Sequence, residues 1–491
     1  TARSPARMTL SISAAQQLDK LKYCCVVPTS LYLSQRRILM KYDVVVIGGG
    51  PGGYVCAIHC TRYGLKTALV EKAELGGTCL NRGCIPTKTL LYAAGLLENI
   101  DKAALFGIRN AGGTPDFAGL RKRCSDVVST LRKGVGRLLK QNKVDIYQGK
   151  GRVVSPTAVS VEGENPVELT TSHIVLAVGG APSIPPIPGS SLPGVYTSDS
   201  LLSELPESKK LVIIGGGVIG VEFAEAYRAF GTDVSIVEMM PRLLPPFDTD
   251  LARHLAALFR KKGIHVFTGA GVKKIEKTEE GLSVSFEKGG KEEFLPADAV
   301  LIATGRHPET KDLLPMEVDM ERGCFKVDSH METSVKGVYA IGDIVYGTVQ
   351  LAHSAEAQGK AAAAAIAGKP CSIELDLVPQ CVYTLPEIAS IGLTEEAAKQ
   401  RDIPIKTGRV VMGSNAKSLI ADEGGYIKIL SDESGYICGA QLFCADADNL
   451  ISEISLAIVN HLTLEEFLKV IRPHPSVEEA LGGAAESALL R

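Results

Sequence analysis

The chain has 491 residues, of which 45% are hydrophobic and 22% are charged, and its formal net charge is −2. This length predicts two to four domains, and the hydrophobic content suffices for substantial cores. No run of 18 apolar residues occurs, so we expect no transmembrane helix and no membrane partner. The near-neutral charge and the lack of basic clusters interleaved with aromatic residues argue against nucleic acid as a partner.

Residues 1–39 differ from the rest of the chain. They hold six basic residues and one acid, Asp19, which gives a local net charge of +5. An acid-poor leader that contains Arg and Ser fits an organelle transit peptide, and it also fits an artefact of start-site choice or of cloning. We expect a leader or disordered extension and favour the artefact or extension. The protein is then cytoplasmic, whereas a transit peptide would direct it to the mitochondrial matrix.

The first predicted strand starts at Met40 and leads into a dinucleotide-binding fingerprint. The fingerprint comprises Gly48, Gly50, Gly53, Gly64 and Glu71. A second copy lies at one fixed offset of 167 residues, at Gly215, Gly217, Gly220, Gly231 and Glu238. The glycines let the backbone and a helix N-terminus approach a pyrophosphate, and the acid at the next strand tip accepts hydrogen bonds from a ribose 2′-OH. Glycine-rich turns of an ordinary α/β sheet would not repeat at a fixed offset, so we expect two Rossmann-like units.

The strand-tip acids also predict the type of nucleotide. A carboxylate repels a 2′-phosphate, so the sites of Glu71 and Glu238 favour nucleotides with a free 2′-OH. An NADP site would need an Arg cluster there, and Arg242 lies beyond Pro241 instead of at the strand tip. We therefore expect the second site to prefer NAD.

A cysteine pair, Cys79 and Cys84, follows the first fingerprint. Residues five apart in a regular helix have Cα atoms roughly 8–9 Å apart, and a disulfide needs about 4.4–6.8 Å. The pair therefore needs an irregular backbone, which Gly76, Gly77 and Gly83 permit. The start of a helix that includes Pro86 would lower a thiol pKa there. Two buried free cysteines are the alternative, but the glycines and the nearby fingerprint favour thiol–disulfide exchange coupled to a redox cofactor. The other ten of the twelve cysteines have no such context, which fits a reducing compartment.

Further elements follow from hydrophobic patterns and turn residues. The expected elements are a charged helix at Phe117–Gln141, a buried strand at Ile174–Gly179, a linker at Pro182–Pro193, a strand at Val338–Asp343, a close-packed helix at Ala352–Ala367, antiparallel strands at Gly425–Leu430 and Tyr436–Leu442, and a helix from Asn449.

These motifs resemble those of the FAD-dependent pyridine nucleotide–disulfide oxidoreductase family. Within that family they most resemble the motifs of the dihydrolipoyl dehydrogenase branch. The similarity covers Met40 to the C-terminus through the motifs GGGPGG, GGTCLNRGCIPTK, GGGVIGVEFAE, ATGRHP, YAIGD and RPHPSVEEA. It implies an α/β fold with Rossmann-like FAD and NAD domains and a C-terminal α+β dimerisation domain. The expected boundaries are 40–185 for FAD, 186–308 for NAD, 309–375 for a central segment that completes the FAD site, and 376–491 for the dimerisation domain.

The resemblance also implies roles for residues. Cys79 would be the interchange thiol that meets the substrate, and Cys84 the charge-transfer thiol beside the flavin. Lys88, paired with Glu222, would lie near the flavin ring, and Asp343 would hold the ribityl chain. The remaining expected cofactor contacts are Gly151, Gly305, Gln350, Leu351, Ala352 and His353, and no metal is expected.

The expected base is His474, oriented by Glu479. A carboxylate that orients an imidazole and keeps it basic lets the ring take a proton from an attacking thiol. In relatives this pair reaches the cysteines of the other subunit, which implies a homodimer. The expected partners are the lipoyl domains and the acyltransferase (E2) core of a 2-oxo acid dehydrogenase complex, or of an acetoin or glycine-cleavage system.

Two departures and several alternatives remain. Arg472 stands where the family commonly has another His, and Ser476 stands where it has Thr, which puts the tuning of the base in doubt.

Glutathione-type reductases usually have Tyr at the position of Val218 and Arg at that of Glu238. Mercuric reductases add a C-terminal cysteine pair, whereas Cys444 is the last cysteine here. A redox-inactive structural flavoprotein would not need Cys79, Cys84 and His474.

Overall fold

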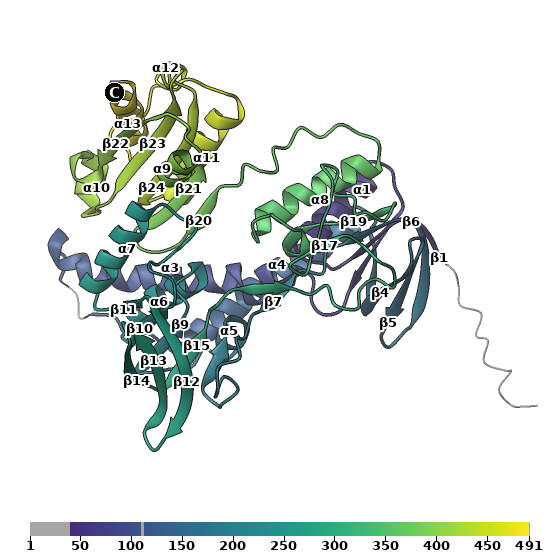
Figure 1. Cartoon of the computed structure of the whole chain (residues 1–491), viewed down its shortest axis with the longest axis horizontal. Helices are drawn as coiled ribbons and strands as arrows, with labels where there is room; N and C mark the ends of the chain where they lie inside the picture. The colour runs from purple at the N-terminus through teal and green to yellow at the C-terminus, as the bar shows by residue number, and fades with distance from the viewer. Residues whose placement is uncertain (1–39, 110–111, 491) are drawn as a thin grey trace, which may run out of the picture. The chain divides into compact units, whose positions relative to one another are not determined.

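The computed structural model describes residues 40–109 and 112–490, so the expected leader, residues 1–39, lies outside the described residues. Three sheets dominate this part of the chain, two built around parallel strands and one antiparallel (Figure 1). In the described ranges, no helix has both the length and the apolar character needed to cross a membrane.

The first sheet has the strand order β3-β2-β1-β6-β5-β4, with β19 added beside β6. Strands β1, β2, β3, β6 and β19 are parallel neighbours, and β4 and β5 form an antiparallel edge. The central strand β1 carries Val44, Val45 and Val46, all fully buried, as expected for a parallel strand covered on both faces. The strands are β1 (Met40–Ile47), β2 (Thr67–Glu71), β3 (Asp145–Gln148), β4 (Lys150–Ser155), β5 (Ala158–Glu162), β6 (Val167–Leu176) and β19 (Val338–Ala340).

Helices of this first unit carry the predicted motifs. They are α1 (Pro51–Arg62), α2 (Gly77–Arg82), α3 (Cys84–Lys102), η1 (Ala103–Phe106), α4 (Phe117–Gln141) and, from later in the chain, η2 (Gly342–Ile344) and α8 (Ala352–Ile366). The predicted helix at 117–141 is confirmed with the same bounds. Helices α1 and α8 lie side by side (Figure 1), and a Cβ on Gly359 would meet the Gly52 carbonyl oxygen at 2.5 Å. The predicted close packing of α8 is therefore confirmed, and it depends on glycine.

The second unit repeats the first in smaller form. Its parallel sheet has the order β11-β10-β9-β15-β8, and an antiparallel sheet, β12-β13-β14, packs on it through a shared apolar cluster. Its elements are β8 (Val195–Thr197), α5 (Ser198–Glu204), β9 (Lys210–Ile214), α6 (Val218–Ala229), β10 (Asp233–Glu238), α7 (Thr249–Lys261), β11 (His265–Thr268), β12 (Ala270–Thr278), β13 (Gly281–Lys288), β14 (Lys291–Ala297) and β15 (Ala299–Ile302).

The chain enters and leaves this second unit through one two-stranded ribbon. Strand β7 (Gly180–Pro182) pairs antiparallel with β16 (Arg306–Pro308). Pro182, the first residue of the predicted linker, is the last residue of β7 and pairs with Arg306 where the chain returns. The returning segment forms β17 (Met320–Glu321) and β18 (Cys324–Phe325) and then supplies β19 to the first sheet.

The C-terminal unit is an antiparallel sheet of order β20-β21-β24-β23-β22. The predicted antiparallel strands are confirmed as β23 and β24, and the helix expected from Asn449 starts two residues earlier as α11. Its elements are β20 (Gln380–Val382), β21 (Glu387–Gly392), α9 (Glu395–Gln400), β22 (Ile405–Val411), η3 (Met412–Ser414), α10 (Ala416–Ala421), β23 (Tyr426–Asp432), β24 (Ile437–Cys444), α11 (Ala447–Val459), α12 (Leu464–Phe467) and α13 (Glu479–Leu489). Helices α11 and α13 share one buried apolar cluster with the sheet.

Candidate active site

The two motif cysteines lie on either side of a break between helices. Cys79 belongs to α2, and Cys84 is the first residue of α3. Gly83 separates the helices, and a Cβ on it would lie 3.0 Å from the Thr78 carbonyl oxygen. A side chain at this position would crowd the last turn of α2, so the close approach of the two helices favours glycine. This break is the irregular backbone that the spacing predicted.

The two thiols are free, partly exposed and in contact with each other. The hydrogen bond from the Cys79 thiol lowers the pKa of Cys84 to about 7, and the nearby Lys88 ammonium acts in the same direction. The same contact, with burial, raises the pKa of Cys79. The thiolate of the reduced pair therefore resides on Cys84, the thiol expected to adjoin the flavin.

Lys88 is held beside the pair by Glu222 of the second unit. Its Nζ lies 2.9 Å from both carboxylate oxygens of Glu222, as the resemblance implies. Glu222 is buried and also accepts the Tyr383 N–H at 3.1 Å, and the Lys88 Nζ stands 4.6 Å from the centre of the Tyr383 ring. Because Cys84 and Lys88 are four residues apart on α3, their side chains share one helix face.

The first fingerprint forms a tight turn with an open end. A Cβ on Gly48 would lie 2.2 Å from the Ala177 carbonyl oxygen, and one on Gly53 would lie 1.9 Å from the Gly48 oxygen. Beside Gly50, the N-cap of α1, the nearest atom to such a Cβ is 3.9 Å away. No side chain caps α1, so its first N–H groups face a space suited to a pyrophosphate. This geometry fits FAD.

The second fingerprint reproduces this geometry. A Cβ on Gly215 would lie 2.4 Å from the Ala303 carbonyl oxygen, and one on Gly220 would lie 2.0 Å from the Gly215 oxygen. Among the described residues, no atom lies within 4 Å of the corresponding position on Gly217, the N-cap of α6. The open N-terminus of α6 therefore fits the pyrophosphate of a second dinucleotide.

The two strand-tip acids share a backbone arrangement that the sequence did not reveal. Glu71 accepts the N–H groups of Gly49 at 2.6 Å and Ala73 at 2.7 Å. Glu238 accepts those of Gly216 at 2.5 Å and Met240 at 2.6 Å. Each carboxylate thus ties its strand tip to its glycine turn. Each carboxylate oxygen has a second lone pair left for a ribose hydroxyl.

Most of the remaining expected cofactor residues lie between the end of β19 and the start of α8, whereas Gly305 and Gly151 lie elsewhere. Asp343 is in η2, and burial raises its pKa. Gln350 Nε2 lies 3.3 Å from the Asp343 carbonyl oxygen, and His353 Nε2 lies 2.8 Å from that of Pro379. Leu351 and Ala352 are the N-cap and first residue of α8, Gly305 follows β15 with φ +107°, and Gly151 is in β4 against Ile47 and Val70.

Sequence reasoning missed two residues that hold this region together. Gln358 is buried on α8, and its Oε1 accepts the Gly342 N–H at 2.6 Å, which fixes the turn before Asp343. Arg306 donates to the Gly180 carbonyl oxygen and lies 3.4 Å from Asp199 and 3.5 Å from the Thr78 hydroxyl. Arg306 thereby links the redox motif to the ribbon. The ATGRHP motif contained the signal for Arg306, whereas nothing in the sequence singled out Gln358.

His474 and Glu479 form the expected dyad. The His474 Nδ1 lies 3.0 and 3.2 Å from the two Glu479 carboxylate oxygens, and the Ser476 N–H donates to Glu479 at 3.0 Å. The Ser476 N–H bond and the His474 ring lower the pKa of Glu479, so its carboxylate stays charged. The His474 side chain is 73% exposed, which leaves its other ring nitrogen available to a substrate.

Arg472 does not replace the missing upstream histidine in the dyad. Its guanidinium pairs with Glu453 at 2.6 Å and lies 4.5 Å from the centre of the Phe467 ring. Arg472 thus anchors the loop before His474 to α11 and α12, and Glu479 orients the imidazole through a hydrogen bond.

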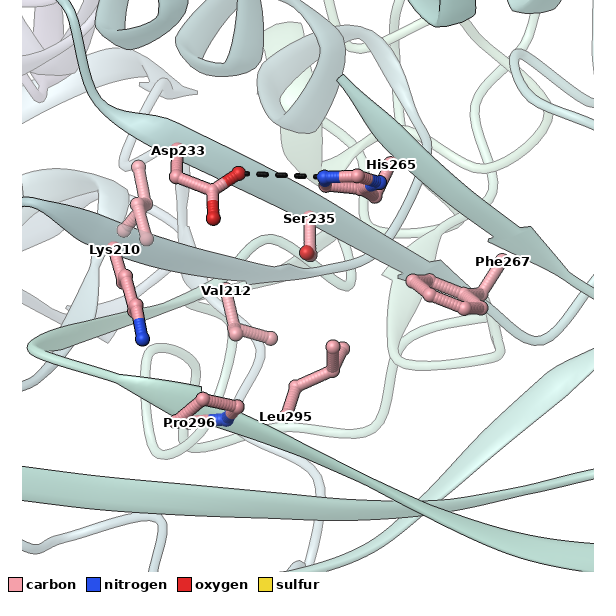
Figure 2. Close-up of a pocket in the computed structure, with 9 residues that line it drawn as sticks. Lys210, Val212, Asp233, Ser235, His265, Phe267, Leu295 and Pro296 are labelled. Atoms are coloured by element: carbon pink, nitrogen blue, oxygen red, sulfur yellow. Dashed lines mark ion pairs between the residues drawn. The ribbon is translucent and has the colours of Figure 1, made fainter. Parts of the chain in front are cut away.

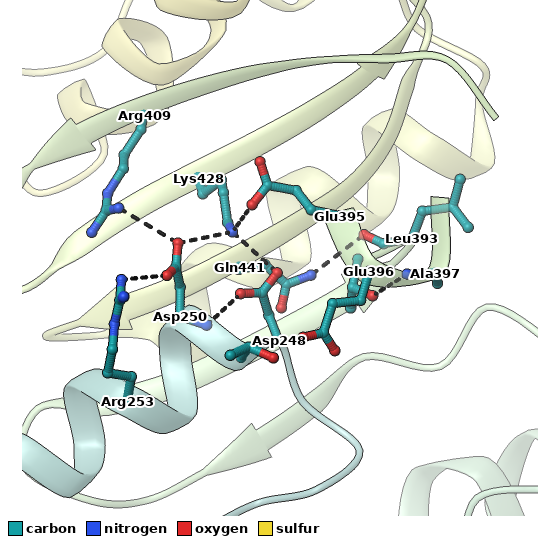
Figure 3. A network of polar contacts seen from close by, with 12 residues as sticks. Asp248, Asp250, Arg253, Leu393, Glu395, Glu396, Ala397, Arg409, Lys428 and Gln441 are labelled. Atoms are coloured by element: carbon teal, nitrogen blue, oxygen red, sulfur yellow. Dashed lines mark hydrogen bonds and ion pairs between the residues drawn. The ribbon is translucent and has the colours of Figure 1, made fainter. Parts of the chain in front are cut away.

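Two other features lie away from this chemistry. A cavity of about 190 Å³ is lined by Lys210, Asp233 and His265, the first residues of β9, β10 and β11 (Figure 2). It therefore lies at the end of the sheet opposite to the fingerprint. Three carboxylates, Asp248, Asp250 and Glu395, lie close enough together to suggest a metal site. They converge on the Lys428 ammonium at 3.0, 3.8 and 2.6 Å instead (Figure 3).

Comparison with known proteins agrees with this geometry. Residues 42–359 match the family described as pyridine nucleotide-disulphide oxidoreductase, and residues 378–485 match the dimerisation domain of that family. Two dihydrolipoyl dehydrogenases of Bacillus subtilis (strain 168) are similar to the chain. One is 38% identical, with 91% of this chain and 98% of the relative covered. The other is 40% identical, with 92% and 97% covered.

A relative from Chlamydia muridarum, also a dihydrolipoyl dehydrogenase, is 40% identical over 91% of this chain and 96% of its own. Among solved structures, the HOCl-induced flavoprotein disulfide reductase RclA from Escherichia coli superposes with a TM-score of 0.80. It is 28% identical, and the match covers 91% of this chain and 99% of that one.

Proposed function

We propose, because this chain belongs to the pyridine nucleotide–disulphide oxidoreductase family, that it is an NAD-dependent dihydrolipoyl dehydrogenase. The observation that carries the proposal is the thiol pair at the α2–α3 break, with the Lys88 ammonium fixed on the same helix by Glu222. The dehydrogenases of similar sequence support the choice of substrate, because the match spans almost their whole length.

The reaction begins with Cys79 and Cys84 joined as a disulfide. One thiol of dihydrolipoamide loses its proton to His474 and attacks the Cys79 sulfur, and Cys84 leaves as a thiolate. The second substrate thiol then attacks the mixed disulfide, which releases lipoamide and leaves Cys79 protonated. Two electrons have passed from the substrate to the cysteine pair. Gly48, Gly50, Gly53 and Glu71 would hold FAD, which would supply the redox link between this dithiol and NAD.

Each protein group has a definite role in this scheme. The Lys88 ammonium stabilises the Cys84 thiolate, which makes Cys84 the better leaving group, and once the pair is reduced the Cys79 thiol also donates a hydrogen bond to this thiolate. Because Cys84 leaves as the stabilised thiolate, Cys79 is the sulfur that forms the bond to the substrate. Glu479 orients the His474 ring and stabilises its protonated form.

The dimerisation domain supports a homodimer as the working form. We propose that the substrate is the dihydrolipoyl group on a lipoyl domain, presented by the acyltransferase (E2) core of a 2-oxo acid dehydrogenase complex or by an acetoin or glycine-cleavage system. An exposed imidazole suits a substrate that arrives on a mobile carrier.

The alternative is a different disulfide reductase, favoured by the similarity to RclA. Steady-state assays of the FAD-loaded homodimer separate the two. We expect rapid NAD reduction with dihydrolipoamide and little turnover with glutathione disulfide, Hg(II) or NADP. Turnover of glutathione disulfide or Hg(II) at rates above that of lipoamide would refute the proposal.

A further inference from the structure

We propose that Glu396 is a specificity-determining residue, because it holds the Arg242 guanidinium away from the nucleotide 2′ position and so excludes NADP. The inference rests on the proposed use of NAD at the second fingerprint. Glu396 itself does not touch the nucleotide in this scheme. It acts through Arg242 and is therefore a positioning residue.

The loop that carries Arg242 lies against the second glycine turn. This loop, 239–248, follows the strand-tip acid Glu238 and folds back over the glycine turn. The Leu244 N–H donates to the Gly216 carbonyl oxygen at 2.9 Å. A Cβ on Gly216 would meet the Leu243 side chain at 2.5 Å. Gly216 also donates to Glu238, so Arg242 is next in sequence to a residue that touches the ribose-recognition turn.

Arg242 contacts Glu396 of the C-terminal unit. Its two terminal nitrogens lie 3.0 and 2.9 Å from the two carboxylate oxygens of Glu396, a bidentate pair. The same guanidinium donates to the Thr249 hydroxyl and, at 3.0 Å, to the Pro245 carbonyl oxygen. These contacts occupy both terminal nitrogens. A bidentate Arg–carboxylate pair is the strongest and most directional form of such an interaction.

Contacts of the neighbouring residues hold Glu396, which accepts the hydrogen bonds of Arg242, in place. Glu396 lies in the first turn of α9, whose N-cap Thr394 accepts the Ala397 N–H at 3.1 Å. Its neighbour Glu395 reaches the buried Lys428, and Lys428 also bonds Asp248 at the end of the same loop (Figure 3). The C-terminal unit therefore contacts the 239–248 loop at Arg242 and at Asp248, and these contacts hold Arg242 toward Glu396.

The group at the 2′ position of the nucleotide decides whether a nearby Arg matters. NADP differs from NAD by a 2′-phosphate, and NADP sites place Arg near the strand tip to accommodate it. Glu238 repels that phosphate, but a free Arg four residues away would offset the repulsion. Pairing with Glu396 removes this compensating charge. Two carboxylates thus contribute to NAD selectivity, one by repulsion and one by restraint.

The test compares NADPH with NADH as reductants of lipoamide. Glu396→Gln should raise kcat/KM for NADPH about tenfold, because it frees a charged hydrogen-bond donor, and should leave kcat/KM for NADH within about twofold. Glu396→Asp, which keeps the charge, should retain the parent selectivity. The double variant Glu396→Gln/Arg242→Ala should lose the gain, since the gain depends on the guanidinium.

The matched control is Glu395→Gln, which makes the same charge change on the adjacent residue without releasing Arg242. It should not alter the NADPH/NADH ratio. An equal gain in Glu395→Gln, a gain that persists without Arg242, or no gain in a folded Glu396→Gln would each overturn the proposal. If Glu396→Gln does not fold, the NADPH/NADH selectivity of Arg242→Ala tests the proposal instead. An unchanged selectivity ratio supports a sequestered Arg242, and a changed ratio refutes it.

Failure of this inference is distinguishable from failure of the proposed function. If the parent reduces lipoamide with NADH and Glu396→Gln gains nothing with NADPH, only the role of Glu396 is wrong. If the parent does not reduce lipoamide with NADH, the proposed function itself is wrong.

Discussion

At the scale of single residues, the acidity of Cys84 depends on its neighbour. An isolated cysteine has a pKa of about 8.5, and the Cys79 hydrogen bond lowers that of Cys84 to about 7. Because an acid with a lowered pKa is charged above that pKa, the reduced protein should carry a thiolate at pH 8 and lose it as the pH falls below 7. Cys79→Ala should shift this titration upward by removing the donor. The ultraviolet absorbance of the thiolate, recorded against pH, measures the pKa of Cys84 in the parent and in Cys79→Ala.

A matched variant separates the hydrogen bond from other effects. Cys79→Ser keeps a donor, so the pKa of Cys84 should stay lower in Cys79→Ser than in Cys79→Ala. Equal titration curves for the two variants would contradict the hydrogen-bond explanation and leave Lys88 as the main cause.

The dyad allows a second prediction at this scale. Removing a general base commonly costs roughly 10²–10⁴ in rate, so His474→Ala should lose at least the lower figure with dihydrolipoamide. Reduction of the flavin by NADH in stopped flow needs no thiol deprotonation and should stay fast. Glu479→Gln should cost less than His474→Ala, since the imidazole remains. A large loss in the NADH half-reaction would show that His474 affects more than the thiol chemistry.

At the scale of elements, one backbone geometry occurs twice and allows a paired test. A Cβ on Gly53 would meet the Gly48 oxygen at 1.9 Å, and one on Gly220 would meet the Gly215 oxygen at 2.0 Å. Gly53→Ala should therefore open the first turn and yield protein with little bound flavin. Gly220→Ala should keep its yellow colour but lose reduction by NADH. Flavin content and stopped-flow reduction by NADH measure the two effects.

The control for that pair is Gly134→Ala in helix α4, where an added Cβ would meet no atom of the described residues within 4 Å. It should leave flavin content and NADH reduction unchanged. If Gly53→Ala and Gly220→Ala each impaired both cofactors equally, the two fingerprints would not act as separate sites.

The elements also show which parts of the structure local sequence can predict. The fingerprints, helix α4 and strands β23 and β24 follow patterns of glycine, charge and alternation that lie within one stretch of chain, so they could be predicted. The pairing of β7 with β16 and the packing of α8 on α1 join segments more than a hundred residues apart. The Arg242–Glu396 pair likewise depends on how two units meet, and the Gln358–Gly342 bond depends on how α8 packs against the turn before it. No periodicity within one segment encodes such contacts.

At the scale of the whole molecule, Lys428 joins the second unit to the C-terminal unit. It is 1% exposed and bonds Asp248, which is 3% exposed. Lys428→Met would leave a buried carboxylate unpaired, which typically costs about 3–5 kcal/mol. Thermal unfolding should show a clear fall in the apparent Tm. Lys122→Met, which breaks an exposed i,i+4 pair with Asp126, should change it little. Similar falls for both variants would contradict the role of Lys428.

The working site is predicted to be shared between two chains. His474 is exposed and its hydrogen-bond partner is Glu479 of the same loop, while Cys79 and Cys84 lie at the α2–α3 break of the first unit. If His474 serves the cysteines of the partner, a heterodimer of Cys84→Ser and His474→Ala chains has one intact site and one doubly damaged site. Each homodimer has two dead sites. The heterodimer should therefore show about half of the parent activity, as two-fold symmetry requires.

The measurement needs co-expression with two different affinity tags, so that only the heterodimer is assayed with dihydrolipoamide and NAD. The matched control is a heterodimer of Cys84→Ser and Cys79→Ser chains. Both of its cysteine pairs are damaged, so it should be inactive whichever histidine serves which pair. Activity near that of the control in a verified Cys84→Ser/His474→Ala heterodimer would place each base with its own cysteines and refute the shared site. Activity near half of the parent value, with an inactive control, assigns His474 to the partner.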